Sequence, residues 1–262
     1  MISVTSAQLD AWLAAFMFPL TRVLALLAVA PIFSNAAIPQ TIRLVVGLAI
    51  TLAIIPVLPT MPAVPAGSWV GLTIIAQQII VGTLLGLAMR LTFTAVDLAG
   101  DLIGLQMGLS FAVFYDPLGS GQTPVVTEFF SLLASLIFLA LNGHLLMLAL
   151  LAQSFTLLPV SVTPVAANGF AVLLAWASTL FAAGVLLALP LVTALLIANI
   201  AMGVLSRVAP QLNLFAIGFP VTIFSGFVVI LISLPYFATA LENLFEQGFS
   251  AMGTIMRAAA GG

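Results

Sequence analysis

The sequence predicts an all-α, membrane-associated fold, and three observations support this prediction. Hydrophobic types make up 63% of the 262 residues, charged types only 5%, and mean hydropathy is +1.35. Several apolar runs reach the roughly 20 residues that a helix needs to cross a bilayer, and no segment alternates like a half-buried strand. A soluble domain carries about 25% charged residues. Lipid or other protein must therefore cover this chain, which excludes a free cytosolic monomer.

Seven apolar stretches define the expected helices in chain order. They are Ala11–Phe33, Leu44–Leu58, Trp69–Met89, Leu91–Phe114, Phe129–Leu158, Phe170–Met202 and Leu214–Leu241. The second stretch is too short for a simple span. Because Arg90 alone separates the third from the fourth, these two stretches form either one long helix or two helices that meet at a bend.

Prolines interrupt the last two stretches, at Pro190 and at Pro220 and Pro235. Proline lacks a backbone donor and clashes with the preceding turn, so we expect kinks or breaks at these positions. Interrupted helices are tolerated in a membrane only where protein or water satisfies the freed backbone groups. Kinked, partly discontinuous helices therefore indicate a packed assembly or an aqueous path.

Charge and motif content exclude several functional classes. The net charge is −2, and five Arg with no Lys cannot build a track for phosphates, so nucleic-acid binding is excluded. The chain has no Cys, and His144 is its single His, which argues against a zinc site. No P-loop, GxGxxG or complete GxSxG motif is present. The sequence therefore predicts no enzyme, no metal site and no cofactor.

Ionisable residues stand inside the fourth stretch. Asp97 and Asp101 lie one helical turn apart, and Arg90 precedes Asp97 by two turns. An ionisable group at membrane depth is a functional-site hypothesis, because its burial is costly without a partner. The three residues are interpreted either as a proton relay or as a structural ion pair or hydrogen-bond site between packed helices.

Glycines on the same stretch form a stripe of small residues. Gly100, Gly104 and Gly108 follow one another at a spacing of four, which places them on one helical face where another backbone can approach closely. Asp101 borders this stripe. We therefore expect a tight helix–helix contact here.

The stripe continues into bulky apolar residues. In the predicted helix Met107, Phe111 and Phe114 share a face, and a Gly/Pro-rich loop, Tyr115–Pro124, follows them. A bulky cluster at a helix end beside such a loop fits a hydrophobic constriction in a pore. Ordinary core packing is the alternative.

A polar segment, Ser206–Asn213, separates the last two stretches. Arg207, Gln211 and Asn213 offer hydrogen-bond donors beside the turn-forming Pro210. A solvated hairpin turn and a docking site for a partner both fit this pattern.

Taken in order, several segments resemble the FliR family, the flagellar relatives of the SpaR/SctT proteins of type III secretion. The resemblance covers nearly the whole chain, and the ordered set of motifs carries it. The matching segments are Arg22-Val23, Ala30-Pro31-Ile32-Phe33, Ile38-Pro39, Arg43, Leu98-Ala99-Gly100, Gly104 to Phe111, Asp116-Pro117, Pro124, Gly143-His144-Leu145, Arg207 to Asn213 and Gly218-Phe219-Pro220.

The resemblance implies a pore-forming subunit of the flagellar protein export gate that assembles with FliP and FliQ. It implies one domain over residues 1–262, with a FliP-like part over about 1–169 and a FliQ-like helical hairpin and tail over about 170–262. FlhB and FlhA are the implied further partners, and unfolded flagellar substrates would pass across the inner membrane within the flagellar basal body.

The resemblance also assigns roles to residues. The family's plug-forming segment matches Gln106–Gln122, so Gln106, Met107, Phe111, Phe114 and Tyr115 would help to close the channel. The tip of the FliQ-like hairpin matches Arg207–Asn213 and would lie near the cytosolic entrance and FlhB. The alternative function is a proton-coupled secondary transporter that uses Arg90, Asp97 and Asp101.

Overall fold

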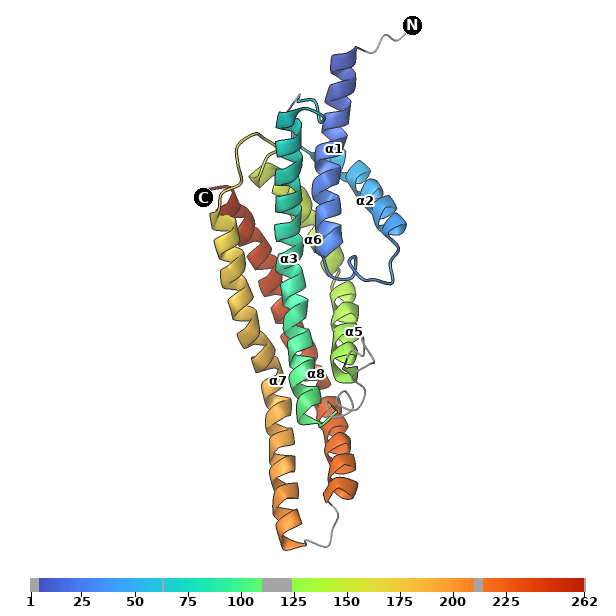
Figure 1. Cartoon of the computed structure of the whole chain (residues 1–262), viewed down its shortest axis with the longest axis vertical. Helices are drawn as coiled ribbons and strands as arrows, with labels where there is room; N and C mark the ends of the chain where they lie inside the picture. Colours follow the sequence, from blue (N-terminus) through green and yellow to red (C-terminus); the bar gives the residue numbers. More distant parts are fainter. Residues whose placement is uncertain (1–4, 63, 110–123, 210–213, 262) are drawn as a thin grey trace. The chain divides into compact units, whose positions relative to one another are not determined.

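The computed structural model describes residues 5–62, 64–109, 124–209 and 214–261, and within these ranges all regular structure is helical (Figure 1). The predicted all-α class is therefore confirmed. The helices are α1 Ser6–Val29, α2 Gln40–Ile54, the short 3₁₀ helix η1 Ile55–Val57, α3 Trp69–Gln106, α5 Val125–Ala140, α6 Gly143–Leu157, α7 Asn168–Val208 and α8 Leu214–Ala259.

The third and fourth apolar stretches form one continuous helix, α3, which runs through Arg90 without a break. Arginine is a good helix former, and the exposed side chain of Arg90 leaves the backbone hydrogen bonds of the helix intact. The predicted helix was expected to reach Phe114, but α3 ends at Gln106.

The fifth apolar stretch was predicted as one segment, and the structure shows two helices in its place. α5 ends at Ala140, and α6 begins at Gly143. Asn142 between them has a φ of 56°, in the left-handed region that Asn tolerates better than most residues. The Asn142-Gly143 pair is a typical turn signal, and it marks the break.

Breaks expected at the prolines are absent from the described residues. α7 continues through Pro190, and α8 continues through Pro220 and Pro235. A proline leaves one carbonyl without its helical donor, whereas unwinding a turn would expose several backbone groups to apolar surroundings. The continuous helix is therefore the less costly arrangement.

The chain divides into two compact units that are not consecutive in sequence. The first comprises Met1–Leu91, Asn142–Ala177 and Glu246–Gly262, and the second comprises Thr92–Leu141 and Ser178–Phe245. Each unit draws segments from both sides of residue 169, the boundary expected from the sequence.

In the first unit α1 packs closely on α3 through two glycines. A Cβ atom added to Gly82 would clash with the carbonyl oxygen of Arg22, and one added to Gly86 would lie 3.0 Å from the carbonyl oxygen of Leu26. The two backbones therefore approach each other through a small-residue contact of the kind typical of membrane helices.

The core of the second unit contains an aromatic cluster. The ring of Phe93 lies 5.5 Å from Phe138 and 5.3 Å from Phe245, measured between centroids, and Phe138 lies 5.4 Å from Phe245. Such edge-on and tilted pairs stabilise a core beyond the area they bury. The cluster connects α3, α5 and α8.

Five described helices are long and apolar enough to cross a membrane, or six spans exist if α5 and α6 count as one broken span. α3 and α7 have 38 and 41 residues, about twice the roughly 20 that a bilayer needs. The chain is therefore a membrane-type protein.

Candidate functional site

The predicted site residues that the structure describes gather mainly on the C-terminal part of α3, in the second unit. Phe111, Phe114, Tyr115, Pro210, Gln211 and Asn213 were also predicted, and they lie outside the described residues.

A glycine cap ends α3. Gly108 has a φ of 79°, and its N–H donates to the carbonyl of Leu105 at 3.0 Å. The N–H of Leu109 donates to the carbonyl of Gly104 at 3.1 Å. These two bonds form the Schellman motif, which favours glycine in the left-handed position. Gly108 was expected to continue the glycine stripe on the helix, and the structure places it beyond the helix end.

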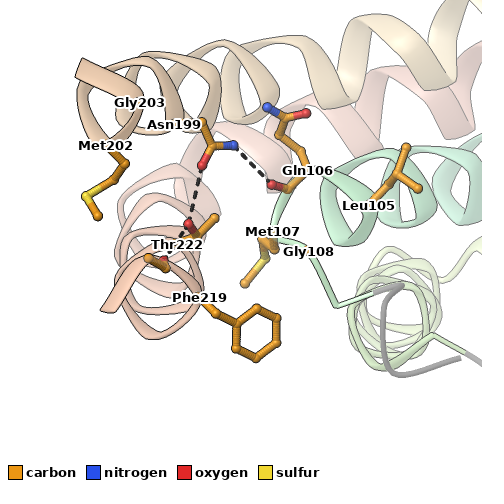
Figure 2. Close-up of a pocket in the computed structure, with 10 residues that line it drawn as sticks. Leu105, Gln106, Met107, Gly108, Asn199, Met202, Gly203, Phe219 and Thr222 are labelled. Carbon is orange, nitrogen blue, oxygen red and sulfur yellow. Dashed lines mark hydrogen bonds between the residues drawn. The ribbon is translucent and has the colours of Figure 1, made fainter. Parts of the chain in front are cut away.

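A side chain from α7 completes the hydrogen bonding at this helix end. The last carbonyls of a helix lack partners within the helix, and the carbonyl of Gln106 accepts from Nδ2 of Asn199 at 3.4 Å. The Oδ1 atom of Asn199 in turn accepts from the hydroxyl of Thr222 on α8 at 3.3 Å. Figure 2 shows Asn199 between its two partners. Three helices therefore meet in one polar chain.

A pocket of about 430 Å³ is lined by these hydrogen-bonded residues. Besides Asn199 and Thr222, its lining includes Leu105, Gln106, Met107 and Gly108 from the end of α3, Met202 and Gly203 from α7, and Gly218 and Phe219 from α8 (Figure 2). Most of the wall is apolar, and its residues with polar side chains are Gln106, Asn199 and Thr222.

Met107 packs against α8 inside the second unit. Its side chain is fully buried, and a Cβ atom added to Gly226 would lie 2.7 Å from its Cγ and 2.8 Å from its Sδ. Gly226 therefore forms the notch that receives Met107. The sequence predicted Met107 as a channel-closing side chain, whereas in the described chain it faces α8.

The two aspartates join α3 to α5. Asp97 accepts a short hydrogen bond from the hydroxyl of Ser131, and Asp101 accepts one from the hydroxyl of Thr127 at 2.5 Å. A Cβ atom added to Gly100 would lie 2.6 Å from the Cα of Thr127. Because the backbones are this close, short hydroxyl side chains can reach the carboxylates.

Exposure of the ionisable residues differs from the burial expected from the sequence. Asp97 is half-buried, whereas Arg90 and Asp101 are exposed in the single chain. Arg207 in the last turn of α7 is also exposed. The exposed carboxylate of Asp101 can accept further hydrogen bonds, since an ionised carboxylate accepts several.

Sequence reasoning missed a buried arginine in the first unit. Arg22 is 1% exposed. Its Nε donates to Oε1 of Gln78 at 2.8 Å, and its Nη1 donates to the hydroxyl of Ser154 at 3.0 Å. The guanidinium also lies 4.0 Å from the ring centroid of Phe155, a favourable cation–π contact. A lone arginine inside an apolar run was the signal in the sequence.

The position of a helix end explains how Arg22 is tolerated. Its Nη2 donates to the carbonyl of Leu158 at 2.9 Å, and Leu158 is the C-terminal cap residue of α6. The C-terminal end of a helix carries partial negative charge. Arg22 is therefore stabilised by α6 and serves as a structural connection among α1, α3 and α6.

The described residues contain no group of three or more His, Cys, Asp or Glu side chains placed to hold a metal ion. His144 lies in the first turn of α6, and its Nδ1 is buried without a hydrogen-bond partner in the described chain. A single imidazole of this kind does not form a metal centre.

Comparison with known proteins identifies the family. The family model described as bacterial export proteins, family 1, matches residues 13–248. The chain is 43% identical over 256 residues to the flagellar biosynthetic protein FliR of Escherichia coli (strain K12) and 41% identical over 256 residues to that of Pectobacterium carotovorum, with 98% of each chain covered in both cases. It is 33% identical to the FliR protein of Aquifex aeolicus, covering 87% of this chain and 88% of that one. This chain therefore belongs to the FliR family of flagellar export proteins.

Proposed function

We propose that this chain is a non-enzymatic, pore-forming subunit of the flagellar type III protein export gate. It assembles with FliP and FliQ in the bacterial inner membrane, within the flagellar basal body, and passes unfolded flagellar substrates. FlhB and FlhA are its further partners in the export apparatus. The family membership supports the export role, and the surface of the second unit supports the assembly.

The observation that carries the proposal is the length of the exposed apolar surface on α7. Within the second unit this surface extends from Phe181, 68% exposed, to Val208, 77% exposed. At 1.5 Å per residue the two positions are about 40 Å apart along the helix. The hydrocarbon core of a bilayer is about 30 Å thick. Lipid could cover this surface only at the limit of about 40° of tilt seen in membrane helices.

Other protein subunits provide the remaining cover in this proposal. On α8, Phe224, Leu231 and Tyr236 are 72%, 69% and 79% exposed, so the second long helix of this unit is also left uncovered by its own chain. Apolar surface of this extent marks protein or membrane interaction sites. Packing against FliP-like and FliQ-like helices would cover both helices.

The channel constriction lies at and beyond the end of α3 in this proposal. Phe111, Phe114 and Tyr115 supply bulky side chains, and apolar side chains leave no room for hydrated ions at rest. Gln106 stands at the start of this segment. Because Met107 is held in the notch at Gly226, we assign it the role of an anchor for the constriction.

Arg207 and the following residues 210–213 form the partner-facing tip in this proposal. Arg207 is exposed in the last turn of α7, where a cation is favoured by the helix dipole. Its charge is available for contact with FlhB near the cytosolic entrance.

The geometry gives less support to the alternative of a proton-coupled transporter. Asp97 and Asp101 accept hydrogen bonds from hydroxyl groups at a tight helix contact, which is the arrangement expected of a structural site. A relay would need carboxylates that face an aqueous path.

Purification tests the assembly. Tagged protein expressed with the FliP and FliQ proteins of the same organism is expected to copurify with both in detergent. A stable monomer that binds a small solute and retains neither partner would support the transporter and contradict the proposal.

Cross-linking tests the pore. A photoreactive amino acid at position 111 or 114 is expected to cross-link to an export substrate stalled in the gate. The matched control places the same amino acid at Leu174, which is 70% exposed on α7. Equal cross-linking at Leu174 and at position 111 would contradict the assignment of the pore.

A further inference from the structure

Within the described residues, each of the last four carbonyls of α3 accepts a hydrogen bond, and one of the donors comes from outside the helix. The carbonyls of Ile103, Gly104 and Leu105 accept from the backbone N–H groups of residues 107, 109 and 108. Within the described residues, the carbonyl of Gln106 accepts from a side chain instead, that of Asn199. Buried or half-buried carbonyls need such partners. Asn199 therefore adds a donor to the two bonds that the glycine cap makes.

The orientation of the Asn199 amide follows from its two partners. The carbonyl of Gln106 can only accept, so Nδ2 must face it, and Oδ1 then faces the hydroxyl of Thr222. The Thr222 hydroxyl also donates to the carbonyl of Gly218 at 2.9 Å. Because a hydroxyl has one proton, the contact from Thr222 to Asn199 is shared. The bond from Asn199 to Gln106 has no such competing acceptor among the described residues.

A second, apolar contact fixes the next residue. Met107 is fully buried, and the notch at Gly226 receives its side chain. Residues 106 and 107 are thus bound from two helices, α7 and α8, and Gly108 follows in the left-handed conformation. These contacts hold residues 106–108 at the end of α3.

We propose that Asn199 is a positioning residue for the channel constriction: it holds the carbonyl of Gln106 and so fixes the end of α3 from which the constriction starts. This inference rests on the proposed function. It adds a residue of α7 to the machinery of the resting gate, with Thr222 as its support.

The proposal predicts leakage without loss of assembly. Asn199→Leu keeps a side chain of similar size but removes the donor to Gln106. Loss of one net hydrogen bond shifts a two-state equilibrium by roughly fivefold. We therefore expect about fivefold faster dissipation of the membrane potential in cells that contain the complete gate, with an unchanged yield of the purified complex.

Variants of α8 refine the test. Thr222→Val removes the shared hydroxyl and is expected to raise leakage less than Asn199→Leu, whereas Thr222→Ser keeps the hydroxyl and restores the resting level. Ser225→Ala is the matched control, because the hydrogen bonds described for the Ser225 hydroxyl go to backbone carbonyls of α8 itself and not to α3 or α7. It is expected to leave leakage unchanged.

A separate variant distinguishes failure of this inference from failure of the proposed function. Replacing Phe111 and Phe114 by alanine removes bulk from the constriction directly and is expected to cause leakage. If this variant leaks and Asn199→Leu does not, the positioning role is wrong and the pore remains. If neither leaks, the constriction itself is wrong, and the inference is overturned with it. Loss of the assembled complex in Asn199→Leu would show a purely structural role and would also overturn the inference.

Discussion

Replacing Arg22 tests how much the buried guanidinium stabilises the protein. Arg22→Met keeps a long, flexible apolar stem but removes every donor and the positive charge. The carbonyl of Leu158, the amide of Gln78 and the hydroxyl of Ser154 then lose their shared partner. The contact with the ring of Phe155 is replaced by an ordinary sulfur–aromatic contact.

The expected loss in the free energy of unfolding of Arg22→Met is the difference between several larger contributions. Each hydrogen bond from a charged group contributes about 1.5–3 kcal/mol, and a desolvated cation–π contact contributes about 2 kcal/mol. Burying the guanidinium opposes these gains by several kcal/mol, and methionine avoids that cost. We therefore expect a net destabilisation of about 2–4 kcal/mol, because three acceptors are left with fewer partners.

Thermal unfolding of the purified export complex measures this loss. With about 2–4 °C per kcal/mol for a chain of this size, the unfolding midpoint is expected to fall by about 4–16 °C. The unfolding midpoint of the Arg22→Lys variant is expected to fall as well, since one ammonium group cannot reproduce the planar guanidinium that reaches three acceptors. The matched control is Arg257→Met, because Arg257 is exposed and its side chain, among the described residues, donates to Thr254 on its own helix.

Two results would refute this reasoning. A midpoint for Arg22→Met within about 1 °C of that for Arg257→Met would mean that the buried network contributes no net stability. A midpoint for Arg22→Lys equal to that of the unchanged protein would mean that charge alone matters and that the hydrogen-bond geometry does not.

Three other predictions concern the helix contacts. Gly82→Ala should destabilise the complex by about 1–3 kcal/mol, because the new Cβ atom meets the backbone of α1. In a thermal melt Gly253→Ala should show no loss, since nothing lies within 4 Å of that position. Asp97→Asn and Asp101→Asn should lower the yield of assembled complex more than they change the pH profile of export. The reason is that a neutral amide accepts hydrogen bonds more weakly than a carboxylate does. An intact complex that no longer exports would favour the relay. Gly108→Ala should lower the unfolding midpoint, at a cost of about 1–2 kcal/mol for the left-handed conformation, and Gly108→Asn should cost less. Equal midpoints for the two Gly108 variants would contradict the role of that residue as a left-handed cap.

The sequence predicted most of the helical segments because hydrophobic composition and length act locally. An apolar run in a membrane must satisfy its own backbone groups, so a helix is the available structure. The break between α5 and α6 also had a local signal, Asn142-Gly143, that the apolar run concealed. Continuous helices through Pro190, Pro220 and Pro235 were not predicted, because the apolar surroundings outweigh the local preference of proline.

The candidate site was only partly predictable. The spacing of Gly100, Gly104 and Gly108 indicated a tight contact at α3, but it did not indicate that Ser131 and Thr127 of α5 would provide hydroxyl groups to Asp97 and Asp101. Met107 was predicted from a helical face, but it lies just past Gln106, where α3 ends. The glycine at position 108 gave a local reason for that helix end, since glycine favours the left-handed cap.

Composition determined that this chain is a membrane-type protein, because 5% charged residues cannot solvate the surface of a soluble domain. The length of the apolar runs determined that it is helical, since about 20 residues cross a bilayer as a helix. Tertiary structure alone decided what the few polar groups do. Arg22 meets partners up to 136 positions away, and Asn199 meets Gln106 across 93 positions. Such pairings depend on which helix faces meet in three dimensions, and no local spacing in the sequence records that choice.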